Sequence, residues 1–466
     1  MSPLAIILWF TLAGLLMATA AFLVLLPSQY KKPSSTGTGN ASVSVQILVL
    51  GDIGRSPRMQ YHALSIAKHG GIVHLIGYHE SPPHPDLLTS PNITIYPLAL
   101  PPKSLTSSSI PFAISGPLKV LWQVGTLLRV LGYTAPASTW LLVQNPPSIP
   151  TLAIALLVSI LRNMRLMIDW HNYGWTILAG TKGASHPFVA ISKLYEIVLG
   201  QCAPTANITV THAMARELRQ PPYEMQSPIV TLHDRPASIF RPLSSPSERE
   251  AFLSRLPETT PFATSILSGA TRLIVSSTSW TPDEDFSLLL DALVSYSHAA
   301  NKPSSSRTPP PILAIITGKG PQKEYYTSRI SALQRSGELH NVRILTAWLS
   351  MPDYASLLRA ADLGVCLHMS SSGVDLPMKV VDMFGSGLPV AAYAGYASFG
   401  ELVKEGVNGV GFETAGELAE LLARLFGPDD GEEELTRLRK GAGEESGLRW
   451  DEEWDRVLGR VFGFTE

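Results

Sequence analysis

The sequence predicts an α/β fold made of two parallel-sheet domains that follow a single membrane-spanning helix. Apolar, strand-like runs alternate with helical patterns in two successive series, which is typical of doubly wound parallel sheets. A Pro- and Ser-rich stretch within 236–268 separates the two series and is expected to be a linker. Residues 4–26 contain no charged side chain. These three observations set the expected order of anchor, first domain, linker and second domain.

The first segment, 1–30, is expected to be a membrane anchor. Its 23 uncharged residues would form a helix of about 35 Å, enough for a hydrocarbon core of about 30 Å. A cleaved signal peptide is the alternative, but the apolar run is long and no basic residue precedes it. Lys31 and Lys32 follow the run, so the positive-inside tendency places the rest of the chain in the cytosol. A short Ser/Gly-rich tether, 31–42, comes next.

The two α/β series define the two main domains, 43–235 and 269–445. The first contains the strand-like runs VSVQILVL, IVHLIGY, ITIYPL, TWLLVQN, MRLMIDW, ITVTH and IVTLH. The second contains RLIVSST, ILAIITG, VRILTAW, LGVCLHM and PVAAYA. The last segment, 446–466, is expected to be an amphipathic helix. In open parallel sheets ligands bind at the carboxyl ends of the strands, so the loops after strands are the candidate sites.

Two apolar segments of the first domain raise the question of membrane contact. Residues 151–161 are too few to span a bilayer and are expected to form a buried helix. Residues 117–133 are apolar except for a few polar positions, among them Lys119 and Arg129. A core helix and a helix lying on a membrane surface both agree with this pattern.

The loop after the first strand, GDIGRSPR, is a candidate diphosphate site. Gly51 and Gly54 would let a ligand approach the backbone, and Arg55 and Arg58 would join the helix amides in holding it. The alternative is an ordinary strand-to-helix turn with solvated arginines. The net charge of −2 and the pI near 6.6 give no reason to expect nucleic acid as the partner.

Another candidate loop, DWHNYG, ends a strand of the first domain. A carboxylate and an imidazole at a strand terminus can accept a proton, so Asp169 and His171 are candidate catalytic bases. A capping aspartate next to a satisfied histidine is the alternative.

The loop STSWTPDED, 277–285, opens the second domain and contains Thr278. Its three consecutive acids suggest a metal site, but Thr281, Pro282 and Glu284 have the spacing of a capping box, which we favour. The next such loop places Lys319 between two glycines, where it could meet a phosphate.

The stretch SSSGVDLPMKVVDMFGSGLPV, 370–390, supplies three further charged candidates. If the helix begins near Asp375, then Asp375, Lys379 and Asp382 lie on one face, close to free backbone amides. The lysine would suit a diphosphate and the carboxylates would suit hydroxyl groups. An i,i+4 surface pair is the alternative, worth about 0.3–0.5 kcal/mol. Glu401 follows the next strand and is expected to join this group.

These motifs resemble those of the two-domain glycosyltransferases. DMFGSGLPV, the glutamate of GELV and the turn Asn408-Gly409 resemble the nucleotide-sugar half of the superfamily with the B-type fold. Together with GDIGRSPRMQYHA, DWHNYG, STSWTPDEDF and TGKGP, they resemble the chitobiosyldiphosphodolichol β-mannosyltransferase family more closely. The resemblance implies two Rossmann-like domains that face a cleft, with an acceptor side in the first and a nucleotide-sugar side in the second.

The resemblance also implies the reaction. Mannose would move from GDP-mannose to GlcNAc₂-diphosphate-dolichol with inversion, forming the β1,4-linked core mannose of the N-glycan precursor. The place would be the cytosolic side of the endoplasmic reticulum membrane, with other mannosyltransferases of the dolichol pathway as possible partners. No cofactor is expected, and dependence on a divalent cation stays open. Donor-binding residues would be Thr278, Lys319, Asp375, Lys379, Asp382 and Glu401, and Gly51, Gly54, Arg55 and Arg58 would hold the acceptor diphosphate.

The sequence departs from the retaining relatives in that superfamily at three positions. Those relatives carry two glutamates eight positions apart. Here Val374 stands at the position of the first glutamate and Asp382 at that of the second. They also keep an Arg and a Lys where Ser279 and Glu284 stand here. A later, retaining mannosyltransferase of the same pathway is therefore the less favoured alternative. A catalytically silent, membrane-anchored subunit is the other, and the polar residues retained here argue against it.

Overall fold

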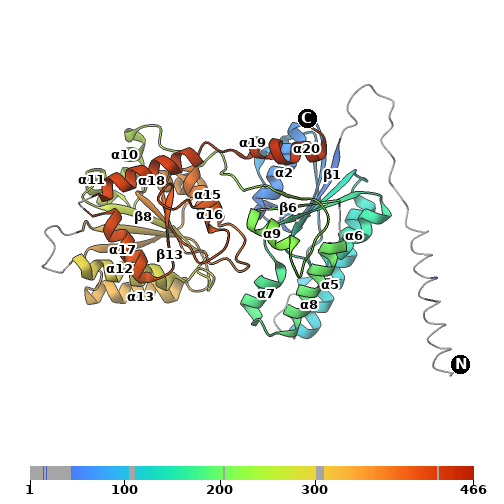
Figure 1. Ribbon diagram of the computed structural model, residues 1–466, viewed down its shortest axis with the longest axis horizontal. Helices are drawn as coiled ribbons and strands as arrows, with labels where there is room; N and C mark the ends of the chain where they lie inside the picture. Colours follow the sequence, from blue (N-terminus) through green and yellow to red (C-terminus); the bar gives the residue numbers. More distant parts are fainter. Residues whose placement is uncertain are drawn as a thin grey trace. The chain divides into compact units, whose positions relative to one another are not determined.

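The computed structural model describes residues 14, 17, 43–103, 111–202, 205–300, 309–427 and 430–465. The predicted anchor and tether, 1–30 and 31–42, lie outside these residues except for positions 14 and 17. No helix in the described ranges is long and apolar enough to cross a membrane. The chain divides into two compact units (Figure 1). One comprises the chain up to Ile208 with Leu218–Val230, and the other comprises Thr209–Glu217 with the chain from Thr231 onward.

The first sheet has the strand order β3-β2-β1-β4-β5-β6-β7, and β3 to β5 pair in parallel. Its strands are β1 (Ser44–Asp52), β2 (Ile72–Tyr78), β3 (Ile93–Pro97), β4 (Trp140–Asn145), β5 (Arg165–Trp170), β6 (Ala206–Thr209) and β7 (Ile229–Thr231). The helical segments are η1 (Ile53–Arg55), α2 (Pro57–Lys68), α3 (Pro85–Thr89), α5 (Phe112–Arg129), η2 (Val130–Thr134), α6 (Thr151–Leu161), α7 (Gly174–Lys182) and α8 (Pro187–Cys202). The next helix, α9 (His212–Arg219), follows β6 in the chain but belongs mostly to the second unit.

The second sheet is parallel throughout, in the order β10-β9-β8-β11-β12-β13. Its strands are β8 (Arg272–Ser277), β9 (Ile312–Thr317), β10 (Val342–Ala347), β11 (Leu363–Cys366), β12 (Val390–Tyr393) and β13 (Gly409–Phe412). The helical segments are α10 (Pro246–Arg255), η3 (Thr260–Phe262), α11 (Ala263–Leu267), α12 (Phe286–Ala300), α13 (Lys323–Ser336), α14 (Met351–Ala360), α15 (Met378–Gly385), α16 (Phe399–Leu402), α17 (Ala415–Leu425), α18 (Gly431–Glu445), α19 (Trp450–Trp454), η4 (Asp455–Gly459) and α20 (Arg460–Phe462).

The core of the second unit explains why its strands read as continuous apolar runs. Successive side chains of a strand point to opposite faces, and helices cover both faces of a parallel sheet. In β8, Ile274 joins one buried cluster, while Leu273 and Val275 join the other. Phe252 of α10 packs into this second cluster as well, so part of the expected linker, 236–268, belongs to the core.

The predicted alternation of strands and helices is thus confirmed in both units, and so is the helix at 151–161. Both sheets reverse their strand order once, at β1 and β4 in the first and at β8 and β11 in the second. Ligand sites of doubly wound sheets lie outside the carboxyl ends of strands at such a point. The loops after these strands are therefore the places to examine.

Candidate active site

The loop after β1 is organised by one carboxylate. Asp52 accepts hydrogen bonds from the backbone amides of Gly54 at 3.3 Å and of Glu80 and Ser81 at 3.1 Å each. A Cβ atom at Gly54 would lie 2.6 Å from the carbonyl oxygen of Ser81, so only glycine can occupy this position. A Cβ atom at Gly51, in contrast, would lie 3.7 Å from its nearest neighbour, a side-chain atom of Val49, so this position has room for a side chain.

The two arginines predicted to hold a diphosphate have different surroundings. Arg55 is 81% exposed at its side chain, with its Nε 3.5 Å from Asp52 Oδ2 and 3.3 Å from the hydroxyl of Ser81. Arg58 is only 5% exposed, and its guanidinium donates to both carboxylate oxygens of Asp169, at 2.9 and 3.1 Å. The salt bridge holds the guanidinium of Arg58 at the end of β5. The sequence had suggested instead that Arg58 binds the acceptor diphosphate. Of the two, Arg55 is the better candidate for the acceptor diphosphate.

Asp169 is the centre of a buried polar cluster at the end of β5. Besides Arg58, ring nitrogens of two histidines lie against its Oδ2: Nε2 of His62 at 3.1 Å and Nε2 of His171 at 2.9 Å. Burial opposes ionisation of Asp169, but the Arg58 charge and the histidines outweigh it and hold the pKa of the carboxyl well below its usual range. Asp169 is fully buried and cannot reach a substrate.

His171 is the member of this cluster with an accessible surface, 23% of its side chain. Its Nε2 contacts Asp169, which leaves Nδ1 as the ring nitrogen that can face a ligand. The backbone amide of His171 donates to the carbonyl of Asn145 at 2.8 Å, so β4 and β5 together fix the residue. An aspartate behind a partly exposed histidine is an arrangement that orients a general base.

A second buried carboxylate supports the same loop. Glu196 of α8 accepts hydrogen bonds from the amide of Gly174 at 2.9 Å, from the hydroxyl of Tyr223 at 3.0 Å and from that of Ser148. Burial raises the pKa of Glu196 despite these bonds. Its place in an apolar helix gave no sign of this role in the sequence. The network fixes the end of the DWHNYG loop through the amide of Gly174.

In the second unit, the loop after β8 differs from its prediction. The expected capping box at Thr281 and Glu284 is wrong, because α12 begins at Phe286, beyond both residues. Instead, Glu284 is buried and forms an ion pair with Lys379 of α15, while its other oxygen accepts from the amide of Ser279 at 2.5 Å. Burial opposes ionisation, but Lys379 lowers the pKa of Glu284.

Two other features of this loop bear on a ligand. The hydroxyl of Thr278 is buried and accepts from the amide of Trp280 at 3.0 Å, which makes Thr278 a support of the loop. Trp280 has a φ angle of 51°, a left-handed conformation that costs a non-glycine residue about 1–3 kcal/mol. Strain of this kind is concentrated at functional sites.

The helix at 378–385 contains only two of the three charged residues expected on it. α15 begins at Met378, so the prediction that Asp375, Lys379 and Asp382 share one helix face is wrong for Asp375. Asp375 lies in the preceding loop, where Ser370 donates to its carboxylate and Nε2 of His368 is 3.4 Å away. Burial and the nearby Asp234 raise the pKa of Asp382 to about 8, although part of its surface is accessible.

The loop after β9 makes a close approach to the loop after β8. A Cβ atom at Gly318 would lie 1.8 Å from the carbonyl oxygen of Thr278, and one at Gly320 would lie 1.7 Å from that of Ser279. Between these glycines, the Nζ of Lys319 sits 3.8 Å from the ring centroid of Trp348. Trp348 follows β10 and is exposed, so it extends the candidate site in a way the sequence analysis missed.

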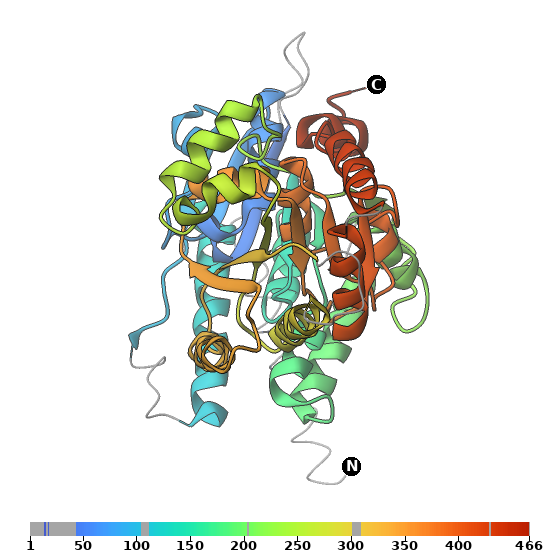
Figure 2. The ribbon, with the colours of Figure 1, turned by 90° about the vertical axis from the view of Figure 1, so that its left-hand side faces the viewer.

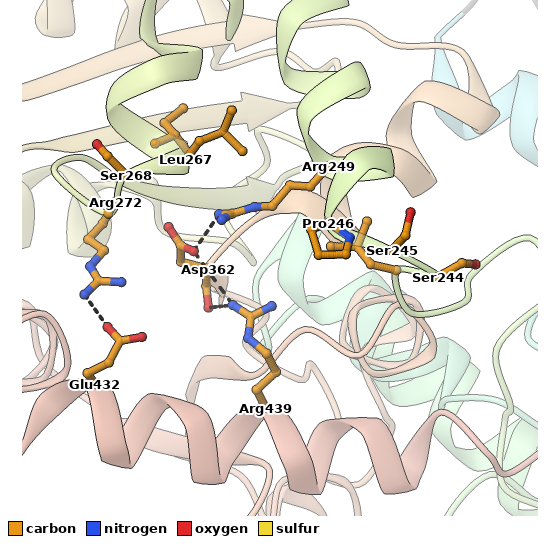
Figure 3. A pocket seen from close by; sticks show the side chains of 13 residues that line it. Ser244, Ser245, Pro246, Arg249, Leu267, Ser268, Arg272, Asp362, Glu432 and Arg439 are labelled. Carbon is orange, nitrogen blue, oxygen red and sulfur yellow. Dashed lines mark hydrogen bonds and ion pairs between the residues drawn. The ribbon is translucent and has the colours of Figure 1, made fainter.

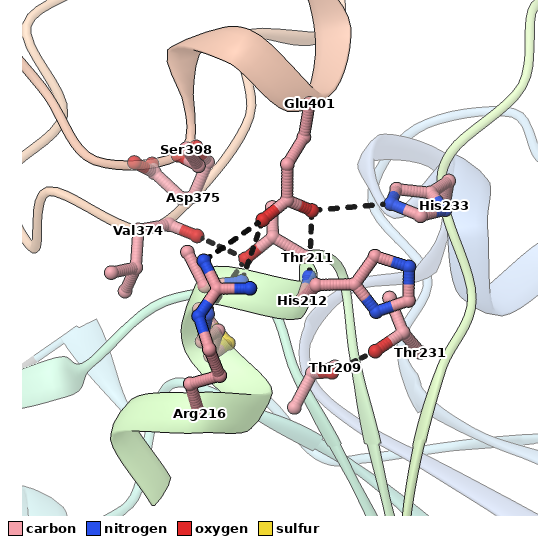
Figure 4. Close-up of polar contacts among 12 residues, drawn as sticks. Thr209, Thr211, His212, Arg216, Thr231, His233, Val374, Asp375, Ser398 and Glu401 are labelled. Carbon is pink, nitrogen blue, oxygen red and sulfur yellow. Dashed lines mark hydrogen bonds and ion pairs between the residues drawn. The ribbon is translucent and has the colours of Figure 1, made fainter.

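Glu401 has protein partners of its own. Its carboxylate accepts from the amides of His212 at 2.7 Å and Ala213 at 2.6 Å, and Nε2 of His233 lies 3.3 Å away (Figure 4). It therefore binds the amino terminus of α9, where negative charge is favoured. Donor binding by Glu401 stays a prediction, and the structure shows that its carboxylate also holds the start of α9.

The second unit also contains a cavity of about 740 Å³ away from these loops (Figure 3). Arg272 begins β8 and Asp362 precedes β11, so the cavity lies at the amino ends of the strands. Its three arginines are paired: Arg249 and Arg439 with Asp362, and Arg272 with Glu432.

In the described part of the chain, no group of three or more His, Cys, Asp or Glu side chains could hold a metal ion.

Comparison with known proteins decides the family. Residues 273–427 match the model of "Glycosyl transferases group 1". A chitobiosyldiphosphodolichol beta-mannosyltransferase of Arthroderma benhamiae is 46% identical over 463 residues, 99% of this chain and 100% of that protein. The protein of the same name from Mus musculus is 39% identical, covering 96% of this chain and 94% of its own length.

The chain belongs to the chitobiosyldiphosphodolichol beta-mannosyltransferase family. The predicted resemblance is confirmed, and the chain is a glycosyltransferase. Among solved structures, sucrose-phosphate synthase from Thermosynechococcus elongatus aligns with a TM-score of 0.65 at 14% identity, over 91% of this chain and 98% of that one. This likeness shows that the chain has the same fold as that protein.

Proposed function

We propose that this chain transfers mannose from GDP-mannose to the chitobiose of GlcNAc₂-diphosphate-dolichol, with inversion, forming a β1,4 linkage. Family membership supports the reaction, since the relatives are named for a β-mannosyl transfer to chitobiosyldiphosphodolichol. We further propose that residues 4–26 anchor the chain in the endoplasmic reticulum membrane, with the two units on the cytosolic side. The uncharged run at 4–26 and Lys31 and Lys32 behind it support this topology.

The single observation that carries the mechanism is the difference in exposure between Asp169 and His171. Asp169 is buried and occupied by Arg58, whereas His171 has an accessible ring nitrogen. His171 is therefore the proposed base, and Asp169 is the residue that positions it. Nδ1 of His171 takes the proton of the acceptor hydroxyl as its oxygen bonds to C1 of mannose. The bond from C1 to the phosphate oxygen breaks with its electron pair, and GDP departs.

The second unit is proposed to bind the donor. Lys379, held by Glu284 at the strand ends, supplies the positive charge that the diphosphate needs as it leaves. Lys319 lies on the neighbouring loop and would add a second cation. Asp375, Asp382 and Glu401 remain the proposed partners of sugar and ribose hydroxyls, and Arg55 that of the acceptor diphosphate.

The experiment measures radiolabelled mannose transfer by the detergent-solubilised chain to GlcNAc₂-diphosphate-polyprenol. GDP-mannose and UDP-GlcNAc are compared as donors, and the product is treated with β-mannosidase. We expect incorporation from GDP-mannose alone, released by β-mannosidase, and lost in Lys379→Ala but not in Lys440→Ala, an exposed lysine of α18. Absence of transfer from either donor by a folded protein would overturn the proposal.

A further inference from the structure

The cavity at the amino ends of the second unit's strands has no part in the proposed transfer reaction (Figure 3). Its volume of about 740 Å³ falls within the range of small-molecule pockets, about 300–1,000 Å³. Asp362, which lines it, immediately precedes β11, whereas the proposed donor loops follow the carboxyl ends of the same strands. The cavity and the candidate donor site therefore lie at opposite ends of the sheet. A ligand in the cavity would leave the proposed donor site free.

Three helices supply the walls of the cavity. α10 contributes Arg249, and α18 contributes Glu432 and Arg439. α11 packs against α10 (Figures 1 and 2) and contributes Ile266 and Leu267. Three serine side chains also line the cavity. It thus combines an apolar wall with a few charged and hydroxyl groups, which is the usual composition of a small-molecule site.

Two of the cavity's arginines share one carboxylate. Nη2 of Arg249 donates to Oδ1 of Asp362 at 2.8 Å. Nη2 of Arg439 lies 3.8 Å from the same oxygen, beyond hydrogen-bond distance, and donates instead to the carbonyls of Ala361 and Asp362 at 3.2 Å each. One of the two guanidinium charges therefore has no carboxylate of its own among the described residues.

Both of these arginines also keep hydrogen-bond donors that the described residues leave unused. Arg249 donates through Nε, to the carbonyl of Ala360, and through Nη2. Arg439 donates through Nη2 alone. The two side chains are 22% and 38% exposed, so their Nη1 groups are accessible from the cavity. Guanidinium groups with accessible N–H donors suit the oxygens of a phosphate, which they can bind in pairs.

The third arginine has a partner that a ligand could displace. Arg272 forms an ion pair with Glu432. The Glu432 side chain is 67% exposed in the first turn of α18, and ion pairs with such exposed groups contribute little to stability. Arg272 is only 15% exposed and lines the cavity. An anion could therefore replace the Glu432 carboxylate beside Arg272 at little cost.

We propose that this cavity binds the phosphate group of a small phosphomonoester among the guanidinium groups of Arg249, Arg272 and Arg439. Once Glu432 is displaced, the three arginines exceed the remaining acid, Asp362, by two positive charges. A phosphate dianion neutralises both, whereas a carboxylate would neutralise one. The cavity is larger than a phosphate ion requires, so the organic part of the ligand has room beside the apolar wall. This inference goes beyond the transfer reaction and does not depend on the identity of its donor or acceptor.

The first test is isothermal titration calorimetry of the detergent-solubilised full chain, with saturating GDP present to occupy the proposed donor site. Inorganic phosphate and glucose 6-phosphate are the probes, and glucose is the uncharged control. We expect both phosphates to bind at one site per chain, and glucose not to bind. Tighter binding of glucose 6-phosphate would indicate a phosphorylated metabolite as the ligand, and equal binding would indicate free phosphate. Failure of both phosphates to bind a folded chain would overturn the proposal.

Substitution of an arginine locates the binding site. Arg439→Gln should weaken binding of glucose 6-phosphate by about tenfold or more, because a charge-assisted contact is lost. Arg437→Gln, an exposed arginine on the same helix, and Lys379→Ala at the proposed donor site should leave this binding unchanged. Affinity that Lys379→Ala lowered and Arg439→Gln did not would place the phosphate at the donor site and overturn the proposal.

A second pair of variants tests the displacement and does not depend on the stability of Arg439→Gln. Glu432→Ala removes the exposed competing carboxylate and should tighten phosphate binding by about fivefold. Glu433→Ala, the neighbouring exposed glutamate that does not line the cavity, is the matched control and should have no such effect. Equal affinity in both variants and in the wild-type chain would show that the ion pairs only fasten α10 and α18 to the sheet, and the proposal would fall.

Discussion

The candidate sites of the two units each place a basic side chain in front of a buried carboxylate, but they do so with different numbers of partners. In the first unit, Asp169 is shared by Arg58, His62 and His171. In the second, Glu284 has one charged partner among the described residues, Lys379. Asp169 thus has a salt bridge with Arg58 besides its contacts with the two histidine rings, whereas Glu284 and Lys379 pair with each other alone among the charged groups described. The difference agrees with the proposal that the first site transfers a proton and the second binds negative charge.

The sharpest way to break this comparison is to remove the accessible imidazole. His171→Gln keeps a polar side chain but cannot take up a proton at neutral pH, so we expect kcat to fall by about 10²- to 10⁴-fold with little change in the KM for GDP-mannose. Steady-state transfer kinetics would measure this. His298→Gln, an exposed histidine on α12, is the control and should be neutral. A His171 variant with normal kcat would exclude this residue as the base.

A smaller effect is expected at the second site when the lysine loses its fixed partner. Glu284→Gln keeps a hydrogen-bond acceptor for the amide of Ser279 but removes the charge that holds Lys379. Loss of a charge-assisted hydrogen bond is worth about 1.5 kcal/mol, so the KM for GDP-mannose should rise about tenfold. Glu324→Gln, on the surface of α13, is the control. If kcat fell while KM stayed unchanged, Glu284 would have a role other than holding the donor-binding lysine.

The last prediction concerns the pH dependence of stability and not the rate of transfer. The pKa of Asp382 is raised from its usual 3.8 to about 8, so the folded chain keeps a proton there that the unfolded chain loses near pH 4. This carboxyl therefore makes the free energy of unfolding decrease as the pH rises from about 4 to 8. Asp382→Asn should remove that slope. The midpoint of thermal unfolding, measured for both chains, should therefore fall less between pH 5 and pH 8 in the variant than in the wild type. An unchanged pH profile in the variant would show that Asp382 is ionised in the folded chain.

The sequence predicted the two α/β series because apolar runs and turn residues are local signals, and the structure confirms them. It also located the loops that contain Asp169, His171, Lys379 and Glu401. It did not predict which charges pair, because Arg58 and Asp169 are 111 residues apart and Glu284 and Lys379 are 95 apart. At Glu284 a local rule favoured a helix cap, whereas the structure pairs this buried carboxylate with a partly exposed lysine from another element. His171 and Arg55 are accessible, whereas Asp169 and Arg58 are buried. Such differences depend on tertiary packing, which the spacing of residues along the sequence does not reveal.

The exposed apolar side chains of α5, α7 and α8 have a practical consequence for producing the enzyme. Removing the apolar run at 4–26 is the usual way to make such a chain express as free protein. The shortened chain would still present Leu121, Leu194 and their neighbours to solvent. These side chains would draw copies together at high concentration, so truncation alone should give aggregates or inclusion bodies. A shortened chain that also carries Leu121→Glu and Leu194→Glu is the rational starting point for crystallisation.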